Sequence, residues 1–447
     1  MKVTLDQVRG CLEGVIPAVV GTCAANGTPN AAYVSQMQYV DPRHVALTFQ
    51  FFNKTRGNIL ANPQASALVI DPVTADAYRL RLLYLRTETE GPLFQHMKAK
   101  LAGIASHSGM AGVFKLQGAD IYLVEAIERV PGGALPRPPA ERNLLTALRG
   151  ASQRLAECCE LDALFDTALA LLAQDFGVSH ALLLMADAPG ERLYTVASRG
   201  YSSTGVGSEV AFGDGVIGVA AQYRVPIRIN HMTMEYAYSR AADDGAGAGA
   251  RRWPLETEIP FPGLAEPHSQ LAVPVMAGGR LLGVLCLESP QDLRFGYDDE
   301  DALVALAGLL GHALLALQQA TEAAATPATA SPAVAPAGVA PLEVRHYRAT
   351  HSIFVGADYL IKGVAGAILW KLLHTQAESG RCDFSNRELR AATDLGLPEV
   401  GDNLEARLVL LQRRLAERCP AIALDKTGRG QFRLRLGQPL RLVEMDG

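Results

Sequence analysis

The sequence lacks the features that would mark a secreted, metal-binding or strongly basic protein. Its seven cysteines form no CxxC pair, and no Cys/His spacing would close a zinc site. An odd number of cysteines without a disulfide framework is typical of free thiols in a reducing cytoplasm. The formal net charge of −5 over 447 residues argues against a general nucleic-acid coat, but it is compatible with one local basic face. We expect a cytoplasmic protein without a bound metal.

A membrane-spanning segment is also not expected. Residues 14–25 resemble a short signal-peptide core, but Asp6 and Glu13 interrupt the basic, acid-free start that a signal peptide needs. The apolar stretch 302–317 carries His312 and is too short to span a bilayer. The sequence therefore predicts no membrane partner.

One segment has no charged residue at all. The twenty residues from Ala323 to Leu342 contain nine alanines and four prolines. Proline lacks a donor N–H and clashes with the preceding helical turn, so the segment cannot form a helix, and it offers no apolar stripe to bury. We interpret residues 321–342 as a semi-extended linker, which makes the chain modular. A long loop inside one domain is the alternative.

Residues 1–130 are predicted to form a small antiparallel barrel. Strand-like runs alternate with turn signals such as Asn-Gly and Asp-Pro, and few helices lie between them. The cluster Asn53, Lys54, Thr55 and Arg56 follows one run, at a predicted strand-to-helix junction. A lysine and an arginine two residues apart at such a junction can clamp a phosphate, assisted by the N–H groups of the helix start. An ordinary solvated turn is the alternative.

The order GTPN, an apolar strand, FFNKTRGNILANP and then ALVIDP resembles the pyridoxamine-phosphate-oxidase-like, flavin-binding split barrel. The resemblance implies a dimer that holds FMN between its subunits, with Lys54 and Arg56 at the phosphate contacts. Strand 31–40 lacks the basic residue that oxidase members place against the flavin, so we predict no catalytic residue here. Haem is the alternative cofactor, with His96 and His107 as candidate ligands.

Residues 131–140 are rich in proline and glycine and are predicted to be a hinge. In the segment 141–320, a long helical pattern over 144–172 precedes several strands and a hairpin with a Gly278-Gly279 turn. This order favours an antiparallel sheet with helices on one side. Three sequence segments resemble those of a GAF domain: GDGVIG, LAVPV…LLGVLCLES and FGYDDEDALVALA. That resemblance implies a unit that senses a small molecule or dimerises through its terminal helices.

A long insert separates the predicted strand ending at Asn230 from the one starting at Gln270. The GAF resemblance places such an insert over the ligand pocket. His231, Tyr236 and Arg240 are therefore candidate contacts for an acidic or aromatic small molecule. A solvated loop with a few anchoring aromatic residues is the alternative.

Residues 343–447 are predicted to form three helices followed by a hairpin. Ser385 and Glu388 have the spacing of a capping box. The third helix has a leucine stripe on one face at positions 404, 408, 411 and 415. The candidate DNA-contacting residues lie on its other face and on the hairpin: Arg407, Arg413, Arg414, Lys426 and Arg429.

The segments LVLLQRRL and KTGRGQFRLRL resemble the winged helix-turn-helix of response-regulator output domains. In such a unit a helix enters the major groove and the hairpin grips backbone phosphates. Lys and Arg number 16 in residues 343–447 and Asp and Glu number 13, a surplus of only three. Because DNA affinity depends on phosphate contacts, a dimer should be needed. A degenerate winged helix that contacts protein is the alternative.

Together these patterns predict a multidomain α+β protein with an N-terminal split β-barrel, a central GAF-type antiparallel sheet with helices, and a C-terminal winged helix. We expect a cytoplasmic, homodimeric sensor and transcription regulator rather than an enzyme. The alternative is a flavin-dependent oxidoreductase with regulatory GAF and winged-helix appendages.

Overall fold

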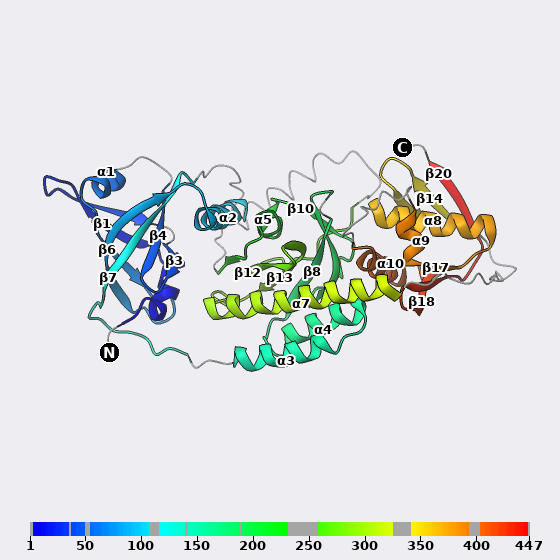
Figure 1. The fold of residues 1–447 in the computed structure, drawn as a ribbon, viewed down its shortest axis with the longest axis horizontal. Helices are drawn as coiled ribbons and strands as arrows, with labels where there is room; N and C mark the ends of the chain where they lie inside the picture. Colours follow the sequence, from blue (N-terminus) through cyan, green and yellow to red (C-terminus); the bar gives the residue numbers. More distant parts are fainter. Residues whose placement is uncertain are drawn as a thin grey trace.

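The computed structural model describes residues 3–34, 37–49, 54–107, 116–138, 142–187, 189–230, 258–324, 341–392 and 403–445. The molecule is elongated, and three groups of elements follow one another in chain order along its long axis (Figure 1). A barrel lies at one end, a helix-covered sheet in the middle, and a smaller mixed unit at the other end.

The N-terminal unit is built on a seven-stranded antiparallel sheet with the order β2-β1-β5-β6-β7-β4-β3. Its elements are η1 (Asp6–Leu12), β1 (Ala18–Cys23), β2 (Pro29–Val34), β3 (Met37–Asp41), β4 (His44–Phe49), α1 (Lys54–Ala61), β5 (Gln64–Ile70), β6 (Ala77–Glu88), α2 (Pro92–His107) and β7 (Gly118–Arg129). Alternate residues of β1 and β5 are buried, which is the period of a strand with one face in a core. The short first helix is a 3₁₀ helix.

The middle unit is a six-stranded antiparallel sheet with the order β10-β9-β8-β13-β12-β11. Its elements are α3 (Leu144–Ala156), α4 (Leu161–Gln174), β8 (His180–Asp187), β9 (Arg192–Arg199), β10 (Glu209–Ala211), α5 (Gly215–Tyr223), β11 (Ile227–Ile229), β12 (Ser269–Ala277), β13 (Arg280–Ser289) and α7 (Tyr297–Ala324). Gly278 and Gly279 both have positive φ and form the predicted hairpin turn.

The helical pattern over 144–172 belongs to two helices, not one. The chain leaves the helical conformation after α3, and Glu160 is the extended N-cap of α4. The leucine stripe continues across the break because both helices bury their leucines in the same hydrophobic cluster. Periodicity alone therefore did not reveal the turn between them.

Helix α7 runs alongside the middle sheet and reaches both neighbouring units (Figure 1). The sequence analysis considered only the apolar stretch 302–317, which is too short to span a membrane. The helix that contains this stretch is 28 residues long. By length and composition this described helix could cross a membrane. Here its Leu303, Leu306, Leu310 and Leu314 are buried, and it packs on β12, α3 and α4.

The C-terminal unit has strands that the sequence analysis missed. Its elements are β14 (Leu342–Tyr347), β15 (Ser352–Val355), β16 (Asp358–Ile361), α8 (Gly363–Ser379), β17 (Asp383–Ser385), α9 (Asn386–Ala391), α10 (Leu404–Arg418), β18 (Ile422–Gly428), β19 (Gln431–Leu436) and β20 (Leu440–Met445). They form a four-stranded sheet, β16-β15-β14-β20, and a three-stranded sheet, β17-β19-β18. Short four-residue strands carry too little alternation to be recognised alone.

Two local predictions for this unit are confirmed. Ser385 caps α9 and forms the expected capping box with Glu388. The stripe at positions 404, 408, 411 and 415 of α10 is buried. Most of the predicted Ala/Pro linker, residues 325–340, lies outside the described residues.

Candidate functional site

The predicted phosphate turn of the barrel lies at the start of α1. Asn53 is outside the described residues. Lys54 is exposed in the first turn, and the Thr55 hydroxyl accepts a hydrogen bond of 3.0 Å from Asn30 Nδ2. An exposed ammonium beside the N–H groups of a helix start fits a phosphate group.

Arg56 lies differently from the sequence expectation, because its guanidinium is engaged within the barrel. Its Nη1 donates to both carboxylate oxygens of Asp120, at 2.6 and 2.7 Å, and its Nη2 donates to Thr87 Oγ1 at 3.2 Å. Asp120 is buried in β7. The charge of Arg56 is thus balanced inside the protein, and Lys54 is the cation at this turn that fits an external phosphate.

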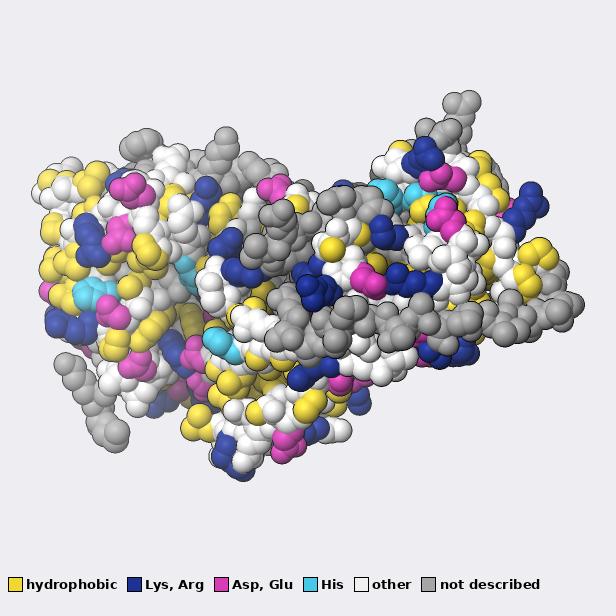
Figure 2. Space-filling view, turned by 45° about the vertical axis from the view of Figure 1, so that its right-hand side comes forward, with side chains coloured by type: hydrophobic (Ala, Val, Ile, Leu, Met, Phe, Trp, Pro, Cys, Tyr) yellow, Lys and Arg dark blue, Asp and Glu magenta, His cyan; other side chains and the backbone are white. Residues whose placement is uncertain are grey.

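Large exposed hydrophobic side chains are present on the barrel. Tyr33, on edge strand β2, is 82% exposed, and Leu60 of α1 is 60% exposed. On the face drawn in Figure 2, hydrophobic side chains gather over the barrel end, with acidic and basic side chains interspersed among them. Exposed apolar groups of this kind are typical of contact surfaces.

The barrel and the middle unit meet through a buried charged cluster. Arg228 of β11 donates to Glu13 Oε1 at 2.6 Å and to Glu300 Oε2 at 2.7 Å. The same guanidinium lies 4.5 Å from the ring centroid of Tyr297. Burial alone would raise the pKa of Glu300, but the charges of Arg228 and Lys100 lower it overall. The two acids and the arginine therefore tie the barrel to the sheet of the middle unit.

Helix α2 of the barrel packs on α5 of the middle unit. His96 of this helix, a candidate haem ligand, lies near Lys100 and Glu300, and burial together with the Lys100 charge lowers its pKa to about 4. His96 therefore lies beside the interdomain cluster around Arg228 and Glu300. The side chain of His107 lies outside the part of the structure that is described.

A buried polar group lies on the sheet of the middle unit. Glu288 accepts hydrogen bonds from Tyr201 Oη at 3.0 Å, from Gln270 Nε2 at 3.0 Å and from the Leu264 backbone N–H at 2.9 Å. Cys286, two residues earlier on β13, is fully buried, and burial raises the pKa of its thiol. The sequence analysis did not single out Glu288, although a carboxylate inside the apolar run LLGVLCLES is a usable signal.

The three candidate ligand contacts of the insert, His231, Tyr236 and Arg240, lie outside the described residues. The described residue Leu264, in the C-terminal part of the insert, donates its backbone N–H to the buried Glu288. This part of the insert therefore borders the polar group on the sheet.

The five candidate DNA-contacting residues of the C-terminal unit fall into three groups. Arg414 Nε donates to the Leu360 carbonyl at 2.9 Å and lies within its own unit. Arg407 and Arg413 face the middle unit, where they pair with Asp187 at 3.1 Å and Asp166 at 2.8 Å. Lys426 pairs with Glu160 of the middle unit, and Arg429 is exposed at the tip of the β18–β19 hairpin.

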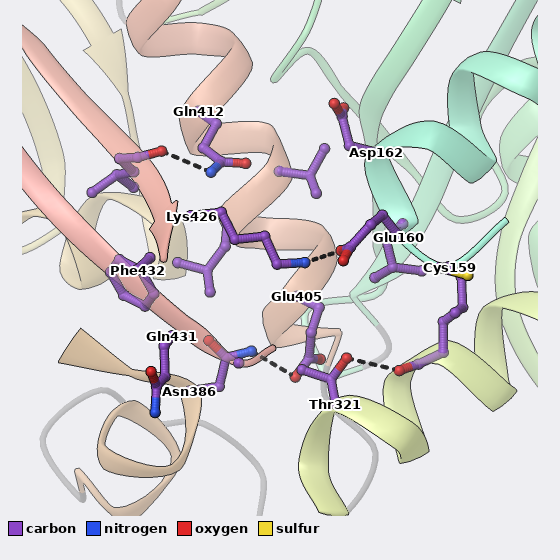
Figure 3. Close-up of a pocket in the computed structure, with 16 residues that line it drawn as sticks. Cys159, Glu160, Asp162, Thr321, Asn386, Glu405, Gln412, Lys426, Gln431 and Phe432 are labelled. Atoms are coloured by element: carbon purple, nitrogen blue, oxygen red, sulfur yellow. Dashed lines mark hydrogen bonds and ion pairs between the residues drawn. The ribbon is translucent and has the colours of Figure 1, made fainter. Parts of the chain in front are cut away.

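A partly open cavity of about 100 Å³ lies between the middle and C-terminal units. Figure 3 shows Lys426 reaching across it to Glu160, with Asn386 and Glu405 hydrogen-bonded at its floor. The lining residues come from both units: Cys159, Glu160, Leu161, Asp162, Leu317, Thr321, Asn386, Glu405, Leu408, Val409, Gln412, Leu424, Lys426, Gly430, Gln431 and Phe432. Among the described residues, no group of three or more His, Cys, Asp or Glu side chains is arranged to hold a metal ion.

Solved structures resemble single parts of this chain. The GAF domain of an Acinetobacter phosphoenolpyruvate-protein phosphotransferase is 19% identical, with a TM-score of 0.31, covering 40% of this chain and 97% of its own. Free methionine-R-sulfoxide reductase from Neisseria meningitidis is 20% identical, with a TM-score of 0.31, covering 40% and 91%. An FMN-binding protein from Syntrophomonas wolfei is 17% identical, with a TM-score of 0.24, covering 27% and 80%.

No curated protein matches the chain. The family model described as "Pyridoxamine 5'-phosphate oxidase" matches residues 4–124, and the model described as "GAF domain" matches residues 160–314. These ranges coincide with the seven-stranded barrel and with the six-stranded sheet and its helices. The chain is a multidomain α+β protein with a pyridoxamine-phosphate-oxidase-like domain at its N-terminus, followed by a GAF domain.

Proposed function

We propose that this protein is a cytoplasmic, homodimeric regulator in which the barrel and the GAF domain receive a signal and the C-terminal unit is a DNA-binding winged helix. The observation that carries the proposal is the arrangement of α10 and the β18–β19 hairpin. The helix buries its leucine stripe, and Arg407 and Arg413 lie on another side, where they pair with carboxylates of the middle unit. A basic helix followed by a basic hairpin suits groove and phosphate contacts.

The structure refines which basic residues would contact DNA. Arg414 is 4% exposed and holds the backbone of β16, so its role is to position α10. Among the candidate residues, Arg407, Arg413, Lys426 and Arg429 lie outside the core of their own unit. We assign phosphate or base contacts to these four.

For the input side, GAF domains typically bind small molecules, and the match to that family supports a ligand on the sheet near Glu288. The match of the barrel to pyridoxamine 5'-phosphate oxidase supports FMN as its cofactor. Lys54 and the first turn of α1 would hold the phosphate of FMN, which would supply a redox-active ring. Haem is the less supported alternative, because His96 lies at the barrel–GAF contact.

A DNA mobility shift with the full chain tests the proposal. Wild-type protein should shift a mixed-sequence duplex at low salt, and Arg413→Ala should weaken the shift about tenfold. Arg149→Ala is the matched control, because Arg149 is exposed on α3 and far from α10 in sequence and contact. No shift at low salt by wild type or by any variant of the chain would refute DNA binding. Flavin absorbance with turnover of a reductant would favour the oxidoreductase alternative.

A further inference from the structure

Helix α10 is covered on two faces by two different units (Figure 1). Its leucines at 404, 408, 411 and 415 are buried, and the helix packs on α8, β16 and β18 of the C-terminal unit. A second row, Asn403, Arg407, Leu410, Arg413 and Glu417, has spacings of three or four residues and therefore lies along one side of the helix. Each polar member of this row contacts the GAF domain.

The polar contacts of this row run the length of the helix. At its N-terminus, Asn403 Nδ2 donates to the Ala186 carbonyl at 3.1 Å, and Arg407 stacks 5.2 Å from the ring centroid of Tyr194. At its C-terminal end, Glu417 accepts a 3.0 Å hydrogen bond from Thr204 Oγ1. Arg407 is 5% exposed and Leu410 is 3% exposed. The GAF domain therefore covers the N-terminal part of this side of α10, whereas Arg413 and Glu417 remain partly exposed.

The charges at the contact are complementary. Arg413 Nε donates to Asp162 Oδ1 at 2.8 Å, Arg413 Nη2 donates to Asp166 Oδ1 at 2.8 Å, and Arg413 Nη1 donates to the Val196 carbonyl at 3.2 Å. Lys426 of the hairpin pairs with Glu160, the N-cap residue of the same GAF helix, α4. Carboxylates of α4 thus occupy the positions that DNA phosphates would take on these cations.

We propose that the GAF domain holds the C-terminal unit in a docked state in which α10 cannot contact DNA. This inference rests on the proposed DNA-binding function. Arg407, Arg413 and Lys426 cannot pair with GAF carboxylates and with phosphates at once, so docking and DNA binding exclude each other. By linkage, a signal that weakens docking strengthens DNA binding by the same factor.

The composition of the contact suits a reversible state. Leu410 supplies an apolar centre, ion pairs that include the partly exposed Asp162 and Asp166 surround it, and the cavity beside Lys426 leaves part of the boundary unfilled (Figure 3). A buried hydrophobic cluster runs through both units, so these polar contacts form only part of the interface. Partly exposed ion pairs are individually weak and are screened by salt.

The test uses the full chain with Asp162→Asn/Asp166→Asn, which removes the two carboxylates around Arg413. We expect amide hydrogen exchange over 404–418 to rise about fivefold or more, and affinity for a mixed-sequence duplex to rise by a similar factor. The control is Glu157→Gln/Asp175→Asn. It makes the same change in net charge at the ends of α3 and α4, away from α10, and should alter neither measurement.

Arg413→Ala separates the two roles of that residue, because it should raise exchange in α10 while lowering DNA affinity. Unchanged exchange in both the double variant and Arg413→Ala would overturn the docked state, whatever DNA does. Raised exchange without DNA binding by any variant would support docking and refute the proposed DNA-binding function. Raised DNA affinity in the control Glu157→Gln/Asp175→Asn as well would overturn the docked state, because the change in net charge alone would explain the higher affinity.

Discussion

At the scale of single residues, the contact between barrel and GAF domain depends on Arg228. Its side chain is 4% exposed and lies between Glu13 and Glu300. Removing one partner of a buried charged group leaves the other charges without compensation, which costs about 3–5 kcal/mol. Arg228 therefore stabilises the junction more through the two acids that it neutralises than through its own packing.

We predict that Arg228→Met lowers the free energy of unfolding by about 3–5 kcal/mol. Arg192→Ala, which removes a surface ion pair with Glu209, should cost about 1 kcal/mol or less. Urea denaturation of the full-length variants, followed by circular dichroism, measures both. Equal losses for the two variants would show that the buried cluster does not stabilise the junction.

His96 makes the same junction sensitive to acid. Its pKa falls to about 4 in the folded protein because burial disfavours the charged ring. Between about pH 4 and 6.5 the unfolded state therefore binds the extra proton, so stability rises with pH in that window and is lost as pH falls through it. The expected slope is on the order of 1 kcal/mol per pH unit.

We predict that His96→Gln flattens this slope, because glutamine does not titrate. Denaturation midpoints between pH 4.5 and 6.5 measure the effect, and His374→Gln, at an exposed ion pair in the C-terminal unit, is the control. A wild-type slope unchanged by His96→Gln would assign the acid sensitivity to another group.

At the scale of elements, α1 is the part of the barrel to which an anion would bind. Lys54→Ala should weaken FMN binding about tenfold, because it removes the exposed cation from the first turn of α1. Titration of FMN fluorescence measures the affinity. Lys98→Ala, on the exposed side of α2, is the control, and equal affinity in both variants would place the flavin phosphate elsewhere.

Sequence patterns predicted some elements well and others poorly, for physical reasons. The Ser385 capping box and the leucine stripe of α10 were predictable because local hydrogen bonds and helical period determine them. Strands β14, β15 and β16 were not, because β15 and β16 have only four residues each and β14 pairs with the distant β20. The break between α3 and α4 was hidden because both helices face the same core.

The candidate site was predictable only in part. The basic residues of α10 were visible in the sequence, but their partners on the GAF domain lie more than two hundred residues away, such as Asp162 for Arg413. The separation of Arg414, which bonds to Leu360, from the outward-facing Arg413 also required the fold. Arg413 and Arg414 are adjacent in the sequence but point to different sides of α10, and the sequence pattern alone does not show which side each one faces.

At the scale of the whole molecule, the three units form a chain of contacts. The Arg228 cluster joins barrel to GAF domain, and the Arg413 contacts join GAF domain to the C-terminal unit. Helix α7 lies along both junctions (Figure 1). A change in the barrel or in the GAF pocket can therefore reach α10 through packed elements, provided that one of these contacts has two states.

We infer that α10 presents DNA-binding cations, and the salt dependence of binding tests this inference. Fluorescence anisotropy with a labelled mixed-sequence duplex gives the affinity at several salt concentrations. The logarithm of the association constant should fall linearly with the logarithm of salt concentration, and Arg413→Ala should reduce that slope by about 1. Arg149→Ala should leave the slope unchanged. Equal slopes for wild type and Arg413→Ala, or no binding at low salt by either wild type or Asp162→Asn/Asp166→Asn, would contradict DNA binding by α10.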